Sequence, residues 1–502
     1  MAYFTGLFAM GLWFSRKNRD TEEYFLGGRR FKGWVIGLSL VGTSISSITF
    51  LAYPGDAFKT AWLRFLPNLM LPVAVVIAAY FFLPFLRRRN SVTAYEYLED
   101  RFGPSIRVYG AAVFIFAQLV RVSLILYLIA LVLQQITGLD SVWCLVIAGV
   151  VVGGYTVLGG IDAVIWTDVI QTIVLMIGGL ACFFIILHAV GGFGPLLDIA
   201  WEHNKLSFAE LENGELRPVN WDLSLTSKTA TMMLLIGLIS WLTEYSSNQN
   251  TVQRFCASAS AAEARKAMFI CAAVSLPMWA FFMFLGTSLF AFFQLFPAEE
   301  ASEILAGTRK AEEILPFFIA RYLPTGFTGL VIAAALAAAM SSLDSSINAI
   351  STVSITDIYR RHIRPDRSEI HYLRIAQLIA SLAAVLMIFG AILLIEAQTK
   401  TLQDTATILT SLLAGGLLSI YCIGFFTRRG DARHILCGIG GTMVFTAWAI
   451  LGSNILPGWL QYPFDLYYTG LIGNIVMFLI AWGLSFVFLT SKDLRGLTVW
   501  SS

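Results

Sequence analysis

Long apolar stretches separated by short polar segments run along almost the whole chain. A helix needs about 20 mostly apolar residues to cross a membrane, and the stretch VAVVIAAYFFLPFL at 73–86 carries no charged residue. The stretches are unbroken rather than alternating in polarity, which excludes a membrane-spanning β-barrel. We therefore predict an all-α integral membrane protein with thirteen spans. They are expected at about 2–15, 33–57, 66–86, 108–136, 141–158, 162–190, 229–253, 267–296, 325–357, 370–396, 402–426, 434–453 and 466–490.

Composition supports this class and narrows it. Hydrophobic residues make up 57% of the chain and charged residues 13%, and the mean hydropathy is +0.73, outside the range of soluble proteins. The net charge of +2 gives no reason to expect a nucleic-acid partner. The longer polar connections, 192–228 and 297–324, are too short for separate domains. We therefore expect one transmembrane domain over 1–502 in a lipid bilayer, with no obligate protein partner evident.

The basic residues predict the orientation. Of the 34 Lys and Arg residues, 24 lie on the same side as the connection 16–32, nine lie on the other side, and Arg121 lies within a span. Basic residues near span ends are retained in the cytoplasm. The chain is therefore expected in the cell inner (plasma) membrane with its N-terminus outside and its C-terminus cytoplasmic.

The second span contains the hydroxyl-rich segment GTSISSITF, from Gly42 to Phe50, followed by Pro54 and Gly55. This pattern favours a helix that is interrupted within the membrane, where freed carbonyl groups can coordinate a cation or a substrate. The alternative is that each hydroxyl bonds a carbonyl of its own helix at a close helix contact. The density of hydroxyl groups favours the interrupted helix.

The ninth span contains AAAMSSLDSSINAIS, in which Ser341, Ser342 and Ser345 share one helix face with Ala338 by their i, i+3, i+4 spacing. Hydroxyl and carbonyl oxygens on one face suit a small alkali cation. The small residues also favour close helix packing, and the two interpretations are compatible.

Two ionisable side chains stand deep inside other spans. Asp168 must be protonated, paired or bound to a cation, because an isolated carboxylate is costly at that depth. Arg121 either pairs with an internal carboxylate such as Asp344 or Glu244, or binds an anionic group of a substrate. The residues alone leave both roles of Arg121 open.

Several motifs together resemble the sodium–solute symporter family, and most closely its sialic acid transporters. The resemblance covers nearly the whole chain. The matching segments are EEYFLGGRR (22–30), SISSITFLAYPGDAF (44–58), AYEYLEDRFG (94–103), YTVLGGIDAVIWTDVIQ (155–171), NQNTVQRF (248–255), AAAMSSLDSSINAIS (337–351) and TDIYRR (356–361).

The resemblance implies a LeuT-type fold of two inverted five-helix repeats. The repeats would cover about 33–190 and 229–426, with one extra helix at 2–15 and two C-terminal helices within 434–490. It also implies a secondary transporter that needs neither a catalytic site nor ATP. An enzyme is not expected, since all five His lie at or near span ends or in connections.

The resemblance implies one or two sodium sites. The first would use backbone and hydroxyl oxygens, at Gly42, Ile45, Ala338, Ser341 and Ser342. The second would use Asp168, Ser341 and Ser345. Between them stands Asp344, where the sialic acid transporters have serine, so Asp344 is expected either to strengthen cation binding or to hold a proton.

The resemblance also implies a substrate site. Ser46, Thr49 and Arg121 match residues that hold the substrate carboxylate, and Ser44 and Asn68 match further contacts. The pocket is expected to differ elsewhere, because two positions that carry phenylalanine in those transporters are occupied here by Arg64 and Leu238.

We therefore expect sodium-driven import of a small carboxylated solute, sialic acid or another sugar acid first. The alternative is a symporter for a neutral sugar, an amino acid or a monocarboxylate, with Arg121 structural. A channel would need a continuous polar pore, and a nutrient sensor would need an output domain. The sequence pattern predicts neither feature.

Overall fold

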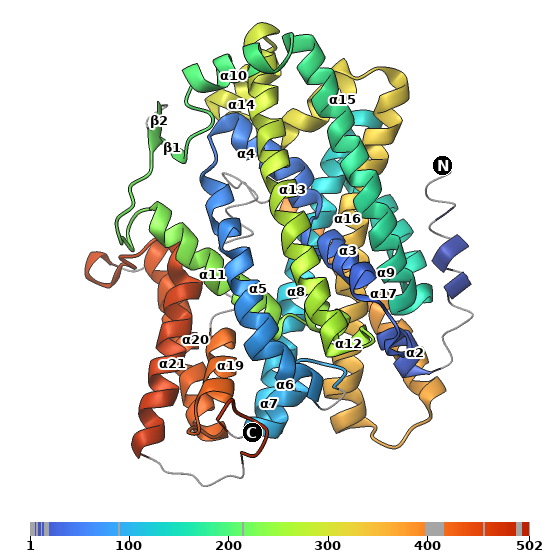
Figure 1. The fold of residues 1–502 in the computed structure, drawn as a ribbon, viewed down its shortest axis with the longest axis vertical. Helices are drawn as coiled ribbons and strands as arrows, with labels where there is room; N and C mark the ends of the chain where they lie inside the picture. Colours follow the sequence, from blue (N-terminus) through green and yellow to red (C-terminus); the bar gives the residue numbers. More distant parts are fainter. Residues whose placement is uncertain are drawn as a thin grey trace.

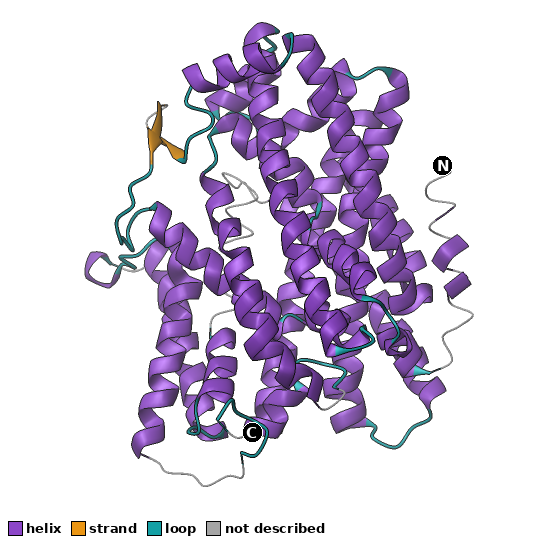
Figure 2. Cartoon of the chain, in the orientation of Figure 1, coloured by secondary structure: helices purple, strands orange, loops and turns teal. Residues whose placement is uncertain are grey.

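The computed structural model describes residues 20–88, 91–212, 215–396, 416–454, 457–487 and 494–500, and a few positions between 6 and 14. Helices account for most of this part of the chain, and most of them run along the long axis of the molecule (Figures 1 and 2). The predicted span 2–15 lies largely outside the described residues. The predicted span 402–426 is described only from Gly416 onward.

Eight helical segments of the described chain are long and apolar enough to cross a membrane, and each coincides with a predicted span. They are Leu63–Arg87, Pro104–Gln134, Gly159–Val190, Ala261–Leu295, Gly326–Ile363, Glu369–Ile395, Ala432–Ser453 and Leu466–Val487. Two further apolar helices, Ser141–Gly154 and Leu417–Phe426, are shorter. These segments confirm a multi-pass membrane protein.

The first half of the chain is helical throughout its apolar stretches. Its elements are α2 (Thr21–Leu26), η1 (Gly27–Arg29), α3 (Gly33–Ser44), η2 (Ile48–Ala52), α4 (Tyr53–Lys59), η3 (Leu63–Met70), α5 (Leu71–Ile77), η4 (Ala78–Phe82), α6 (Leu83–Arg88), α7 (Glu96–Phe102), α8 (Pro104–Thr137), α9 (Ser141–Val190) and α10 (Phe193–Glu202).

The second half of the chain begins with a short β-hairpin. Its elements are β1 (Ala209–Glu212), β2 (Glu215–Pro218), α11 (Ala230–Ser247), α12 (Gln249–Ala257), α13 (Ala261–Leu295), α14 (Glu299–Ala306), η5 (Ala311–Glu313), α15 (Ile314–Tyr322), α16 (Thr325–Val353), η6 (Ser354–Ile363), α17 (Glu369–Glu396), α19 (Leu417–Phe426), α20 (Ala432–Asn454), η7 (Gly458–Leu460), η8 (Leu466–Tyr468) and α21 (Thr469–Val487).

The predicted interruption of the second span is confirmed. Helices Gly33–Ser44 and Ile48–Lys59 meet at a bend of 57°. At the break Ile45 has extended backbone angles, and the Ser46 hydroxyl accepts a hydrogen bond from the Ile48 amide at 3.2 Å. A serine side chain thus satisfies an amide that an uninterrupted helix would have bonded internally.

One other predicted span is also broken, and one long helix is divided where two spans were predicted. Gly160, with φ of 62°, divides α9 between the predicted spans 141–158 and 162–190, at a left-handed conformation that favours glycine. The predicted span 229–253 is divided into α11 and α12 at Asn248, which is extended and accepts the Asn250 amide at 3.0 Å. Broken helices therefore occur in both halves of the chain.

The polar connections lie at the two ends of the bundle. Helices α10, α14 and α15 and the hairpin share one end, and α7 lies near the other (Figure 1). The hairpin is antiparallel, with Ala209 opposite Pro218 and Glu212 opposite Glu215. It is absent from the sequence prediction, which expected helices alone.

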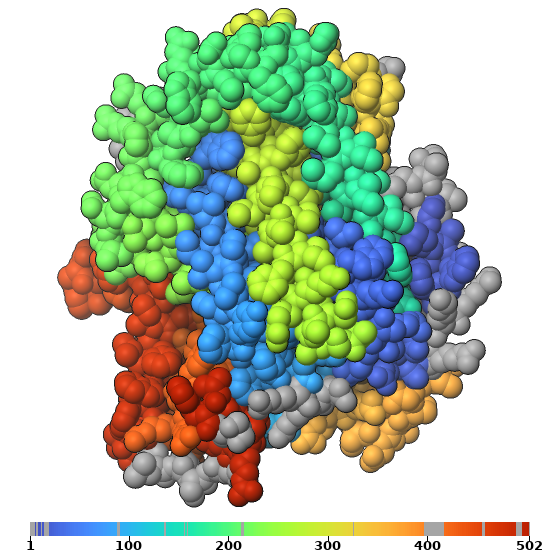
Figure 3. Space-filling model, in the orientation of Figure 1, coloured from blue at the N-terminus to red at the C-terminus, as the bar shows by residue number. Residues whose placement is uncertain are grey.

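Helix α16 lies at the centre of the bundle and packs against α9, α8 and α3. Helix α13 passes along α4 and α5 (Figure 3), where a side chain at Gly286 would collide with the Pro54 backbone. The face of α17 that carries Leu378, Leu382 and Phe389 is exposed, as expected where a helix faces lipid. At the centre, α3 and α12 pack against α16, and η2 at the α3–α4 break packs against both α8 and α16.

Candidate functional site

The oxygens predicted to bind sodium converge where α3 ends against α16. The Ser341 hydroxyl oxygen lies 2.8 Å from the Gly42 carbonyl oxygen and 3.2 Å from the Ala338 carbonyl oxygen. The Ser342 hydroxyl donates to the Thr43 carbonyl at 3.3 Å. The last carbonyls of a helix lack intrahelical partners and carry partial negative charge.

The remaining predicted ligand of this group, Ile45, stands at the break itself, directly after the last residue of α3. Its extended backbone ends the helical hydrogen-bonding pattern there. Together with the carbonyl and hydroxyl oxygens from α3 and α16, this arrangement suits a dehydrated monovalent cation.

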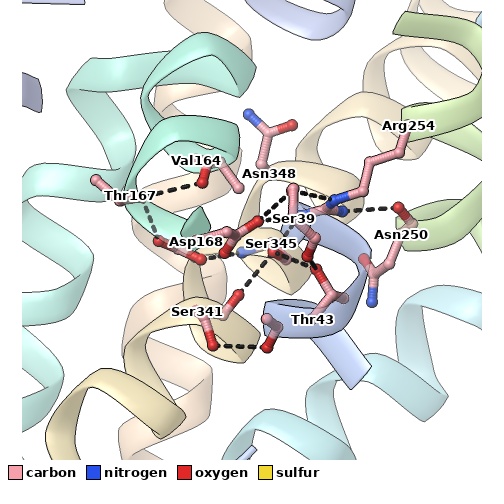
Figure 4. Close-up of polar contacts among 12 residues, drawn as sticks. Ser39, Thr43, Val164, Thr167, Asp168, Asn250, Arg254, Ser341, Ser345 and Asn348 are labelled. Atoms are coloured by element: carbon pink, nitrogen blue, oxygen red, sulfur yellow. Dashed lines mark hydrogen bonds and ion pairs between the residues drawn. The ribbon is translucent and has the colours of Figure 1, made fainter. Parts of the chain in front are cut away.

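A second polar cluster lies beside the first and is fully buried (Figure 4). Asp168 from α9 pairs with Arg254 from α12, with 2.7 Å between Oδ2 and Nη2. The same guanidinium donates to Ser39 of α3 at 2.8 Å and to Ser345 of α16 at 2.6 Å. The Ser345 hydroxyl oxygen is also 3.3 Å from the Thr43 hydroxyl oxygen. Four helices are thus joined through one ion pair.

This cluster has a buried carboxylate oxygen to spare and a second carboxylate close by. Asp168 Oδ1 makes no hydrogen bond within the described part of the chain. Asp344 is fully buried nearby, where Thr167 donates to its Oδ2 at 3.5 Å. Two carboxylates thus lie in one buried cluster, an arrangement that favours binding of a cation or a proton.

Arg254 is a buried residue that the sequence analysis did not place in the site. The count of basic residues assigned it to a cytoplasmic connection, and in the structure its side chain is 1% exposed. Sequence reasoning also left the partner of Asp168 open. The sequence held a signal for this residue, because Arg254 lies in the segment NQNTVQRF and directly follows the end of the predicted span 229–253.

A cavity of about 380 Å³ lies between the two broken helices. Residues from α8, α11 and the helix breaks line it, together with residues from η8, α19 and α21. Predicted residues Ser44 and Arg121 are among them. A cavity of this size with a few converging polar groups fits a small-molecule ligand.

Arg121 faces this cavity with most of its hydrogen-bonding capacity unused. Its Nη2 donates to the Thr43 carbonyl at 3.2 Å. No ion pair reaches its guanidinium from any residue that the structure describes. The two carboxylates named as possible partners, Asp344 and Glu244, therefore do not pair with it here.

The other predicted substrate residues lie outside the cavity lining. Ser46 and Thr49 are buried at the α3–α4 break, and Leu238 is partly buried on α11. Asn68 donates to the Tyr53 hydroxyl at 2.9 Å.

Arg64 has partners of its own on two elements. It pairs with Asp56 of α4 at 3.1 Å and donates to the Tyr467 hydroxyl of η8. Arg64 therefore joins η3 to η8 rather than lining the cavity.

Sequence reasoning missed several polar residues of the cavity, and three of them come from outside α11: Gln118, Tyr467 and Asn474. Gln118 accepts hydrogen bonds from Asn250 at 3.1 Å and Ser346 at 2.9 Å, and so connects the cavity wall to α12 and α16. Tyr467 and Asn474 come from the last helical region, which the predicted repeats exclude.

One of the three carried a signal in the sequence. Gln118 is an amide within an apolar span and lies three residues before Arg121, a spacing that places both side chains on one helix face. A search for every uncharged polar group beside Arg121 would have found it.

Two broken helices that meet at a polar cavity, beside convergent carbonyl and hydroxyl oxygens, define a multi-pass membrane transporter. A model of the sodium:solute symporter family matches residues 24–440. The chain belongs to this family and is a transporter rather than an enzyme.

Relatives and a solved structure agree with this assignment. The chain is 29% identical over 483 residues to the sodium/sialic acid symporter NanT of Aliivibrio fischeri, a match that covers 96% of this chain and 91% of that protein. It is 30% identical over 475 residues to the sodium/sialic acid symporter SiaT of Proteus mirabilis, covering 94% and 91%. A substrate-bound, outward-open Na⁺-coupled sialic acid symporter matches with a TM-score of 0.85 at 28% identity, over 98% of both chains.

Proposed function

We propose that this protein imports a small carboxylated solute, sialic acid or another sugar acid first, by sodium-coupled alternating access. The observation that carries the substrate class is Arg121, a guanidinium without an ion-pair partner among the described residues, which lines the cavity between the broken helices. A planar guanidinium binds a carboxylate through two parallel hydrogen bonds. The relatives named for sialic acid transport support this choice.

Coupling follows from two neighbouring carbonyl groups at the end of α3. The Gly42 carbonyl contacts Ser341 in the proposed sodium site, and the Thr43 carbonyl accepts from Arg121 in the cavity. Sodium that fixes the end of α3 would therefore also fix the acceptor that orients Arg121. Each ligand then favours the conformation that binds the other.

We propose two cation sites. The first uses Gly42, Ile45, Ala338, Ser341 and Ser342. The second uses the spare Asp168 oxygen with Ser341, Ser345 and Asp344. The cation at the second site is either sodium or a proton on Asp344.

The architecture proposed for transport is the pair of inverted repeats at about 33–190 and 229–426, within thirteen spans. A broken helix at the start of each repeat, α3–α4 and α11–α12, supports this division. The protein is proposed to lie in the plasma membrane, and the distribution of basic residues supports an external N-terminus and a cytoplasmic C-terminus.

Uptake of radiolabelled solutes into proteoliposomes tests the proposal. Sialic acid should enter with sodium and not with potassium, and a carboxylated sugar should compete better than its neutral analogue. Arg121→Lys keeps the positive charge but loses the planar guanidinium that can donate two parallel hydrogen bonds, so it should impair uptake strongly. Equal competition by the neutral analogue, or normal transport by Arg121→Lys, would instead favour a neutral-solute symporter with a structural Arg121.

A further inference from the structure

The cavity contains one acidic side chain in addition to its one basic side chain. Among the described residues that line it, Arg121 comes from α8 and Glu244 comes from α11, near the α11–α12 break. The remaining lining groups are apolar, hydroxyl or amide side chains, apart from backbone at glycine. The described lining therefore carries no net formal charge but is polarised.

Glu244 is held in place by neutral donors. Asn248 donates to its Oε2 at 2.6 Å, and Thr251 donates to its Oε1 at 2.7 Å. No ion pair reaches this carboxylate from the part of the chain that the structure describes. Each carboxylate oxygen can accept more than one hydrogen bond, so Glu244 keeps capacity for a ligand in the cavity.

From this arrangement we infer that Glu244 determines specificity by accepting hydrogen bonds from the hydroxyl or ammonium groups of a substrate whose carboxylate binds Arg121. The inference rests on the proposed function and deepens it. A second carboxylate on the substrate would meet the charge of Glu244, which is partly buried, and repulsion there is stronger than in bulk water. The favoured solutes are thus hydroxyl-rich or zwitterionic monocarboxylates, and dicarboxylates are rejected.

A purely structural role for Glu244 makes a different prediction. Its bonds to Asn248 and Thr251 span the helix break, and its charge lies near the N-terminus of α12, where a negative charge is stabilising. Thr251→Val removes one of these bonds without changing the charge in the cavity. Glu244→Gln removes the charge while keeping the shape and one carbonyl oxygen.

The test compares sodium-dependent binding of sialic acid, D-glucuronate and D-glucarate to purified full-length protein by titration calorimetry. D-glucarate carries a second carboxylate that D-glucuronate lacks. Wild type and Thr251→Val should bind D-glucuronate at least about tenfold more tightly than D-glucarate, about 1.4 kcal/mol. Glu244→Gln should reduce this ratio to near one.

A failure of the role of Glu244 and a failure of the proposed function would give different binding results. Binding of the monocarboxylates with an unchanged ratio in Glu244→Gln would overturn the role of Glu244 alone. A ratio lost equally in Thr251→Val would assign the effect to the helix break and would also overturn that role. If wild type bound none of the three acids in sodium, both the proposed function and this inference would be wrong.

Discussion

Ser341→Ala gives the most direct test of the first sodium site. The hydroxyl bridges two helices, at 2.8 Å from the Gly42 carbonyl oxygen and 3.2 Å from the Ala338 carbonyl oxygen. Removing one neutral ligand from a buried site costs about 1–3 kcal/mol. The variant also leaves the Gly42 carbonyl without that donor when sodium is absent, and this offsets part of the loss.

We therefore expect the sodium concentration for half-maximal uptake to rise about tenfold, equivalent to about 1.4 kcal/mol. Sodium activation curves in proteoliposomes measure this directly. Ser351→Ala is the matched control, because Ser351 is a buried serine of the same helix that donates to the Ala376 carbonyl at 2.8 Å, away from the site. A shift in Ser341→Ala no larger than that in Ser351→Ala, at normal expression, would refute the assignment.

Three further predictions address other parts of the molecule. Arg254→Gln should lower the free energy of unfolding in sodium-free detergent solution by about 3–5 kcal/mol, because it leaves Asp168 without its buried partner. Adding Asp168→Asn should restore much of this loss. Equal stability of the single and double variants would argue against the Asp168–Arg254 ion pair. Burial lowers the pKa of Lys205 to about 7. Between about pH 7 and 10 the unfolded chain therefore holds more protons than the folded protein, and folding stability should rise with pH. The unfolding midpoint of Lys205→Met should lack this rise, and a pH profile identical to that of the wild type would contradict the prediction. Single cysteines at 360–367 should be protected from an impermeant thiol reagent in intact cells and those at 297–310 should react, whereas the opposite labelling would reverse the orientation.

The sequence predicted the membrane class, the positions of eight spans and the break after Ser44, because these depend on local apolar runs and hydroxyl density. The pairing of Asp168 with Arg254 could not be derived in the same way. It depends on which helices meet in space, and Arg254 stands at the edge of its apolar run. The hairpin had a usable signal in the Asn213–Gly214 dipeptide, which favours tight turns between strands.

The substrate site shows a similar division. Arg121 was found because a lone charge within a span is costly. Arg64 has its own partners, Asp56 and Tyr467, and sequence position alone did not reveal them. The contribution of Asn474 required the placement of α21 beside α11 and α19.

Accumulation of sialic acid against its own gradient tests the central claim most directly. Proteoliposomes with equal sialic acid inside and outside should concentrate it when sodium is higher outside. They should show no net accumulation when sodium is equal on both sides or replaced by potassium. Accumulation that is the same with and without the sodium gradient, or none under any gradient, would contradict sodium-coupled import of this solute.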